Sequence, residues 1–437
     1  MRLPSLVTRS RVPRDLAAVT AVNRDAEVEP RALDVTVEGV EQIWRAVERL
    51  YASGIHPAIQ LCVRRHGEVL IDRAIGYASG NGPRDARQAD KVPATPATPF
   101  NIFSASKAVT AMLIHLLDQR RLVHLNDPVC EYIPEFAAHG KDRITIQHLL
   151  THRAGIPNLP PEVMRLEHLE NEQTILELLY DTRLTWRPGR RLAYHAITGG
   201  FLLGEIVRRV SGKPVRTFLR DEIQRPLGLR WMNYGVAARD VSKVARNYLT
   251  GPPLLPPLST LLERALGLPM AELVEVSNDP RFLTAVVPAG NIVATANEMS
   301  RFYQLLLAGG TLDGRTIFEP RTIRRAVQEQ SYLEFDMTLV LPLRYAMGFM
   351  LGGRTLSLYG PDTDAAFGHL GFTNVITWAD PDRQVSGALM TSGKPLIYPE
   401  IYYLHDLMWT IDTVCTKTRR RPTRSRARRP RAAAARR

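Results

Sequence analysis

The chain has 437 residues, of which 45% are hydrophobic and 23% are charged, so a substantial buried core is expected and wholesale disorder is excluded. No run of about 18 consecutive apolar residues occurs, which excludes an ordinary transmembrane helix. The net charge of +13 suggests a nucleic-acid partner, but residues 416–437 hold ten arginines and one lysine without any acid, which is +11 of the +13. The rest of the chain is nearly neutral, and no specific nucleic-acid partner is expected.

The two ends of the chain are expected to lie outside the folded body. Residues 1–34 contain no unbroken apolar stretch of the kind found in secretory signals, and we expect an N-terminal extension. Residues 416–437 have no apolar period, which predicts a disordered basic tail, either simply solvated or available to anionic surfaces. Cys62, Cys130 and Cys415 are too widely spaced to suggest a disulfide framework, which together with the missing signal favours a cytoplasmic location.

The first half of the chain predicts a helix, a hairpin and a second helix. Residues 35–52 carry apolar side chains at helical spacing. The apolar runs 58–63 and 68–78 flank a glycine-containing turn, which predicts a β-hairpin. A loop rich in Gly, Pro and Asp over 79–99 leads to a strongly helical stretch at 105–120.

The middle of the chain is predicted to be mostly helical. Short helices and turns are expected over 126–158, and a longer helix within 194–211 is closed by Gly212. Residues 251–270 are rich in Pro and Leu, which favours a loop packed on the body or a lid over an acyl chain. A further amphipathic helix is expected over 295–307, with a threonine at its capping position.

Strands from residue 345 onward and a closing helix at about 400–414 complete a pattern in which both ends of the chain contribute strands. One antiparallel sheet flanked by helices, with an inserted helical lobe, is the economical arrangement. We therefore expect one α/β (α+β) catalytic domain over 35–415. Its sheet-containing lobe takes 35–120 and 295–415, and its mostly helical lobe takes 121–294.

The candidate nucleophile lies in Ser104-Ala105-Ser106-Lys107, which is the one S-x-x-K element in the sequence. Side chains three residues apart share one face of a helix, so Lys107 is within reach of the Ser104 hydroxyl. A serine becomes nucleophilic when a neighbouring base takes its proton, and a lysine with a lowered pKa can be that base. Taken alone, the same pattern also fits a capping serine followed by an exposed lysine.

Several further segments follow this element in an order typical of one enzyme family. TPFNIFSASKAVTAMLIHLL contains the nucleophile, and it is followed by LNDPVCEYIPEF, IQHLLTHRAGIP, WRPGRRLAYHAITGGFLLGEIVRRVSGKP, VPAGNIVATANEMSRFYQLLLAGG and FGHLGFTNVITWADP. Over residues 35–414 the chain resembles the serine β-lactamase-related family of class C β-lactamases, D-Ala-D-Ala carboxypeptidases and carboxylesterases. The resemblance implies a β-lactamase/transpeptidase-like fold and acyl transfer to Ser104, without a metal or an organic cofactor.

The second element of that family is Tyr-x-Asn, and the matching residues are Tyr194, His195 and Ala196. The resemblance makes Tyr194 a proton-transfer group that hydrogen-bonds Ser104 and Lys107, provided that the nearby cation lowers the pKa of the phenol. Ala196 replaces the asparagine that contacts the amide of a β-lactam, which argues against β-lactam turnover. Tyr-His-Ala at this place resembles the carboxylesterase branch.

The third element is Lys-Thr-Gly in β-lactamases, and the matching run here is His369-Leu370-Gly371. His369 is expected to donate a hydrogen bond to the tyrosine or to the substrate. Gly371 would let the backbone approach the acyl group closely. By analogy, the N–H groups of Ser104 and Phe372 would form the oxyanion hole.

Other chemistries have weaker support. His148 and His152 have the spacing of a metal-binding pair, but no acidic residue follows His148, and no metal is expected. The sequence has no G-x-S-x-G, Walker A or G-x-G-x-x-G element. The favoured function is hydrolysis of small or medium acyl esters through a Ser104 acyl-enzyme. A β-lactamase or D-Ala-D-Ala carboxypeptidase, and a non-catalytic scaffold with the same fold, are the alternatives.

Overall fold

The computed structural model describes residues 7–418, apart from 159–165, 170, 258, 261, 264–266 and 356. Its α-helices are α1 (Val37–Ala52), α2 (Ser106–Gln119), α3 (Ile146–Leu150), α4 (Leu166–Leu169), α5 (Glu172–Asp181), α6 (Thr198–Ser211), α7 (Val215–Leu219), α9 (Met270–Val276), α10 (Pro280–Thr284), α11 (Ala296–Leu307), α12 (Pro320–Ala326) and α13 (Ile401–Val414). Short helical turns are η1 (Ala17–Val19), η2 (Pro30–Leu33), η3 (Phe103–Ala105), η4 (Val129–Glu131), η5 (Pro134–Arg143), η7 (Arg220–Gln224) and η8 (Ala238–Lys243). The strands are β1 (Thr20–Val22), β2 (Ala58–Arg65), β3 (Glu68–Ser79), β4 (Val92–Pro93), β5 (Phe100–Asn101), β6 (Asn233–Tyr234), β7 (Ile292–Ala294), β8 (Thr311–Leu312), β9 (Arg315–Thr316), β10 (Ser331–Asp336), β11 (Leu341–Tyr345), β12 (Met350–Leu351), β13 (Phe367–Gly371), β14 (Val375–Asp380) and β15 (Val385–Thr391).

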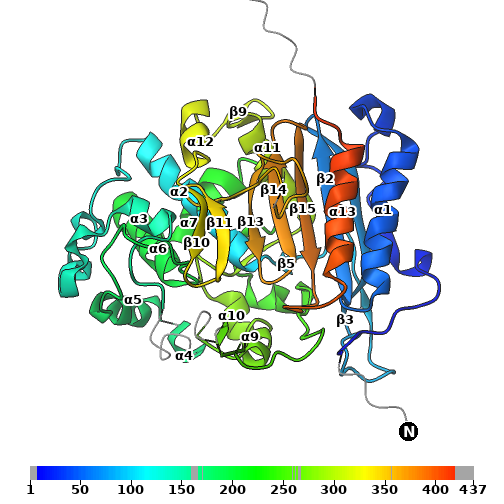
Figure 1. Ribbon diagram of the computed structural model, residues 1–437, viewed down its shortest axis with the longest axis horizontal. Helices are drawn as coiled ribbons and strands as arrows, with labels where there is room; N and C mark the ends of the chain where they lie inside the picture. The colour runs from blue at the N-terminus through cyan, green and yellow to red at the C-terminus, as the bar shows by residue number, and fades with distance from the viewer. Residues whose placement is uncertain are drawn as a thin grey trace, which may run out of the picture.

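The central sheet joins strands from both ends of the chain (Figure 1). Within the described residues its order is β1-β3-β2-β15-β14-β13-β12-β11-β10, and β4 pairs with β3 beside this path. The predicted hairpin is confirmed as β2 and β3, whose turn places His66 and Gly67 at positive φ. Residues 20–22, which were expected to precede the fold, pair with β3 as an edge strand.

The sheet separates two apolar layers because alternate side chains of a strand point to opposite faces. On β2, Ile59, Leu61 and Val63 pack in the same core as α1 and α13, whereas Ala58 and Cys62 pack in the core that contains α2 and α11. Figure 1 shows α1 and α13 side by side over one face of the sheet. This arrangement fixes α2, and with it the nucleophile segment, against the opposite face.

The helical lobe is attached to the nucleophile segment by a small separate sheet. Its strand order is β5-β7-β6. β5 precedes Ser104, β6 lies in the middle of the helical lobe, and β7 comes just before α11, so the small sheet joins these three regions. Phe100 on β5 pairs with Ala294 on β7, and Asn233 on β6 pairs with Val293. β5, which leads into α2, is therefore hydrogen-bonded to the helical lobe through β7.

The predicted helices are confirmed with small changes at their ends. Thr295 caps α11 by accepting from Glu298 N while the Glu298 side chain accepts from Thr295 N, a reciprocal pair that satisfies two free N–H groups. Gly212 ends α6 in the left-handed conformation that a glycine adopts without steric cost. The helix expected at 105–120 begins at Ser106, because the preceding 3-10 turn η3 contains Ser104.

The start of the basic tail differs from the expected disorder. Lys417 pairs with Asp362, and the Thr418 N–H donates to the Asp382 carbonyl at 2.8 Å. These contacts fix residues 416–418 against the body, whereas 419–437 lie outside the described residues. Part of the Pro/Leu-rich segment 251–270 lies outside them too, and α9 begins at its last residue. No helix within the described residues is long and apolar enough to cross a membrane.

Candidate active site

Ser104 is presented by a turn that β7 holds in place. The Ile102 N–H donates to the Ile292 carbonyl at 2.9 Å, and Ser106 Oγ accepts from the Ile292 N–H at 3.0 Å. Ser106 is therefore structural, because its hydroxyl binds the backbone of β7. Phe103 has a φ of +48°, a conformation that is uncommon outside glycine, and Asn101 Oδ1 accepts from its N–H at 2.9 Å. Phe103 therefore holds a strained backbone conformation directly before Ser104.

Lys107 lies against the Ser104 hydroxyl, as the S-x-x-K spacing predicted. Its Nζ is 3.1 Å from Ser104 Oγ, 2.7 Å from the Ala196 carbonyl oxygen and 3.0 Å from the Ala289 carbonyl oxygen. A neutral amine has two N–H groups and one lone pair. The two carbonyls can accept both N–H groups, which leaves the lone pair facing the Ser104 hydroxyl.

Burial makes the neutral amine accessible near neutral pH. The pKa of Lys107 is lowered from 10.5 to about 7, because the surrounding protein removes water that would solvate the charge. Lys107 can therefore act as a base, which an exposed lysine cannot do at this pH.

Tyr194 reaches the site from the helical lobe. A hydrogen bond joins its side chain to Ser104, and Lys107 Nζ lies 4.7 Å from the centre of its ring. Burial raises the pKa of Tyr194 well above 10, the Ser104 hydrogen bond opposes this, and the charge of Asp336 adds to it. The expectation that Lys107 lowers the pKa of this phenol is therefore wrong, and Tyr194 rests in its protonated form.

Two residues that position Tyr194 were not identified from the sequence. Asp336, at the end of β10, accepts from the Tyr194 N–H at 3.0 Å and also from the N–H groups of Thr338 and Leu339. His152 Nδ1 accepts from the His195 N–H at 3.2 Å, and the His152 ring lies 4.7 Å from the Tyr194 ring. An Asp two residues before a Thr is a local signal for a turn in which the carboxylate accepts from the Thr N–H, as Asp336 does from Thr338. The bond between Asp336 and the Tyr194 N–H joins distant parts of the chain, and no sequence pattern indicates it.

His369 lies on β13, and its ring centre is 6.3 Å from that of Tyr194. Burial, reinforced by the charge of Lys107, lowers its pKa to about 3, so the imidazole is neutral. Its Nδ1 is 2.8 Å from the Leu370 carbonyl, which can only accept, so Nδ1 carries the proton and Nε2 is an acceptor. The expected donor role toward the tyrosine or the substrate is therefore wrong for this tautomer.

The end of β13 closes on the nucleophile turn. A Cβ on Gly371 would lie 2.3 Å from the Ile102 carbonyl oxygen, so only glycine permits this approach. The Phe372 ring is 5.5 Å from the Phe103 ring. This packing places the Phe372 backbone beside Ser104, where the sequence-based expectation puts the oxyanion hole.

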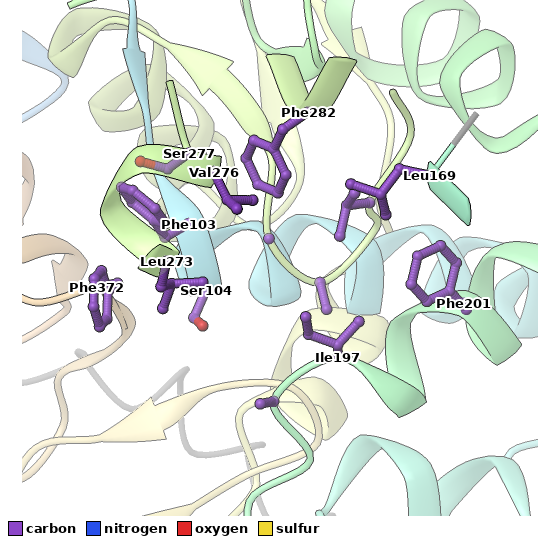
Figure 2. A pocket seen from close by; sticks show the side chains of 14 residues that line it. Phe103, Ser104, Leu169, Ile197, Phe201, Leu273, Val276, Ser277, Phe282 and Phe372 are labelled. Atoms are coloured by element: carbon purple, nitrogen blue, oxygen red, sulfur yellow. The ribbon is translucent and has the colours of Figure 1, made fainter. Parts of the chain in front are cut away.

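Ser104 and Phe372 stand at the junction of two apolar pockets. The first, here called the enclosed pocket, has a volume of about 770 Å³ including its mouth and lies beside Ala196, Ile197 and Ala289. Figure 2 shows Ser104 and Phe372 toward one side of this pocket and Leu169 and Phe201 toward the other. The second, here called the sheet groove, has a volume of about 1180 Å³ and contains Tyr194 and Gly371.

The two histidines at metal-like spacing serve the backbone instead. His148 Nδ1 accepts from the Thr145 N–H at the start of α3, and His152 Nδ1 accepts from His195 N–H. Among the residues that the structure describes, no three His, Cys, Asp or Glu side chains gather as metal ligands would. The i,i+4 spacing here reflects a capped helix followed by a turn.

Comparison with known proteins identifies relatives of the whole chain and of its fold. Esterase/beta-lactamase LipL of Mycobacterium tuberculosis is 29% identical over 347 residues, which cover 76% of this chain and 76% of that protein. A penicillin-binding protein homolog from Caulobacter crescentus has a TM-score of 0.74 at 28% identity, over 87% of this chain and 98% of that one. A family VIII carboxylesterase has a TM-score of 0.73 at 24% identity, over 87% and 99%, which supports the fold.

The β-lactamase/transpeptidase-like fold that the sequence predicted is thus confirmed. The family described as Beta-lactamase matches residues 44–401, which is most of the chain. The protein therefore belongs to the Beta-lactamase family.

Proposed function

We propose that this hydrolase is a serine carboxylesterase that forms an acyl-enzyme on Ser104, with Lys107 as the base and Tyr194 as the acid. The observation that carries the proposal is the apolar character of both pockets beside Ser104. No Arg, Lys, Asp or Glu is among the described residues that line either of them. The name of LipL, which joins esterase to β-lactamase, supports the same reading and keeps β-lactams in the test.

The described residues that line these pockets include no Arg or Lys, which argues for esters over β-lactams and peptides. Penicillins, cephalosporins and D-Ala-D-Ala peptides all present a carboxylate, which needs a cation or several donors when it leaves water. Lys107 lies beside Ser104, but its Nζ is already held by two backbone carbonyls and burial favours its neutral form. A neutral ester has no such requirement, so it suits these pockets better.

Acylation follows from the resting protonation states. Ser104 Oγ adds to the ester carbonyl carbon while its proton passes to the lone pair of Lys107. The ester C–O bond then breaks, and Tyr194 gives its proton to the departing alkoxide. A phenol with a raised pKa is still a stronger acid than an aliphatic alcohol, so this transfer is downhill. The N–H groups of Ser104 and Phe372 would stabilise the oxyanion in between.

Deacylation reverses these roles with water. The water oxygen adds to the acyl carbon as its proton passes to the Tyr194 oxygen, which lost one during acylation. The bond from the acyl carbon to Ser104 Oγ breaks, and Lys107 returns the proton to the serine. The cycle releases one alcohol and one carboxylic acid and restores Ser104, Lys107 and Tyr194 to their starting forms.

The proposal is tested by comparing two substrates and a covalent probe on the purified full chain. The wild type should hydrolyse p-nitrophenyl butyrate, should leave nitrocefin unchanged, and should be labelled by a fluorophosphonate, whereas Ser104→Ala should do none of these. Ser106→Ala is the matched control, because its hydroxyl bonds the backbone and not the nucleophile. Nitrocefin turnover without ester turnover would indicate a β-lactamase, and failure of both reactions would favour a non-catalytic scaffold.

A further inference from the structure

The position of Tyr194 distinguishes the two pockets chemically. Tyr194 contributes to the sheet groove, whereas the enclosed pocket is lined by Ala196, Ala289 and their neighbours. In the proposed reaction, Tyr194 protonates the leaving oxygen, so the alcohol part of the ester must lie on its side. The acyl part, which stays on Ser104 after the alcohol departs, must then extend into the enclosed pocket.

The sheet groove is built to hold hydrocarbon. Leu370 on β13 and Ile376 on β14 form its floor, Leu341 on β11 forms one wall, and Leu404 and Met408 on α13 form the other. Figure 1 shows β13 and β14 between β11 and α13, where this floor lies. Its volume of about 1180 Å³, which includes its open mouth, exceeds the 770 Å³ of the enclosed pocket.

The apolar lining continues onto the surface at the mouth of the groove. Leu341 is 56% exposed and Ile401 is 42% exposed, although both contribute to the groove. Ile397, four residues before Ile401, is 61% exposed. Exposed apolar side chains grouped around a cavity mark a surface that gains free energy when a hydrophobic group covers it.

From these observations, and on the basis of the proposed esterase function, we infer that the sheet groove binds the alcohol arm of the substrate, and that this arm is a long hydrocarbon chain. The preferred substrates are then esters of long-chain alcohols with acids short enough for the enclosed pocket. The alcohol arm is the expected occupant because Ser104 and Tyr194 line the same groove, so an ester bound at Ser104 can extend directly into it.

Two ester series measure this preference. The first holds butyrate constant and lengthens the alcohol from ethanol to dodecanol, and the second holds ethanol constant and lengthens the acid over the same range. Each series is dispersed in the same detergent and followed by titration of the released acid. In the alcohol series, kcat/KM should rise by up to roughly fourfold per added methylene until the groove is full. In the acyl series, the rise should stop at a shorter chain.

Charged substitutions in each pocket separate the two arms. Leu341→Asp and Ile401→Asp change exposed positions on opposite walls of the sheet groove, and an acid in the first turn of α13 suits the helix dipole. Each should lower the ratio of kcat/KM for dodecyl butyrate to kcat/KM for ethyl butyrate by tenfold or more. Leu273→Asp, a partly exposed position in the enclosed pocket, is the matched control, and it should reduce the acyl series instead.

The outcomes distinguish this inference from the proposed function. If ethyl butyrate is cleaved with dependence on Ser104 but the alcohol series is flat, the esterase stands and the assignment of the groove is wrong. The assignment is also wrong if Leu341→Asp and Ile401→Asp reduce the acyl series, or if all three variants reduce both series equally. If no ester is cleaved, both proposals fail together.

Discussion

The lowered pKa of Lys107 predicts how activity depends on pH. A lysine with its usual pKa of 10.5 is neutral in about one molecule per thousand at pH 7.5, whereas one with a pKa of about 7 is neutral in about three quarters. Burial thus increases the active form of the base by nearly a thousandfold at this pH. The base must be neutral to act, so kcat/KM for a neutral ester should rise about tenfold per pH unit below 7 and level off above 8.

The neighbouring groups do not titrate in this range. Burial holds the pKa values of His195 and His369 at about 3 and that of His152 well below its usual value, while that of Tyr194 is raised above 10. An inflection near pH 7 therefore reports a buried lysine, Lys107 or Lys394, and a variant of Lys394 distinguishes the two. Ethyl butyrate is a suitable substrate, because it has no ionisable group of its own.

One other buried lysine offers a matched control. Burial also lowers the pKa of Lys394 to about 7, but its Nζ donates to the Thr391 carbonyl and lies over the Phe103 ring, whereas Lys107 Nζ contacts Ser104 Oγ. Lys394→Met should keep the inflection, whereas Lys107→Arg should lose activity by 10²-fold or more without recovery up to pH 9.5, since a guanidinium stays charged. An inflection above pH 9, or one that vanishes in Lys394→Met, would refute this reasoning.

Four further predictions concern the positions around the nucleophile. Tyr194→Phe should lower kcat for ethyl butyrate by about 10²-fold or more. It should lower kcat for p-nitrophenyl butyrate much less, because that leaving group needs no proton. An equal loss on both substrates would contradict the role of Tyr194 as the acid. Gly371→Ala should abolish most activity while the chain still folds, because the added Cβ meets the Ile102 carbonyl; an unchanged rate would contradict the close approach. Asp336→Ala should lower the free energy of unfolding by about 2–4 kcal/mol in urea denaturation, because the buried Tyr194 N–H and two partly buried N–H groups lose their acceptor. Asp336→Asn should restore much of this stability, and equal stabilities of the two variants would speak against this account. Removal of residues 419–437 should leave kcat on a dissolved ester unchanged, and a collapse of the rate would give the tail a role in the folded body.

The elements that sequence patterns identified are those with a local physical cause. The S-x-x-K spacing places Ser104 and Lys107 together because both residues lie within one helical turn. The alternating and helical apolar periods predicted the β2–β3 hairpin and the helices α1, α6, α11 and α13, since each period reflects which face of the element is buried. Tyr194 and the run His369-Leu370-Gly371 were found through resemblance, because no spacing connects them to Ser104.

The protonation states at the site were decided by the tertiary structure alone. Whether a phenol beside a lysine has a raised or a lowered pKa depends on burial, which the sequence does not show, and burial prevails at Tyr194. The tautomer of His369 likewise depends on one carbonyl that faces its Nδ1. Neither result follows from residue identity.

The sequence by itself placed Ser104 beside Lys107 and indicated the layered fold, because these depend on spacing within one element or on the period of buried side chains. The tertiary structure alone decided which distant groups support them, as Asp336 supports Tyr194, and how the two apolar pockets divide at Ser104. Contacts across the sheet and between lobes depend on how whole elements pack. That packing minimises exposed apolar surface over the entire molecule, so no short stretch of sequence contains it.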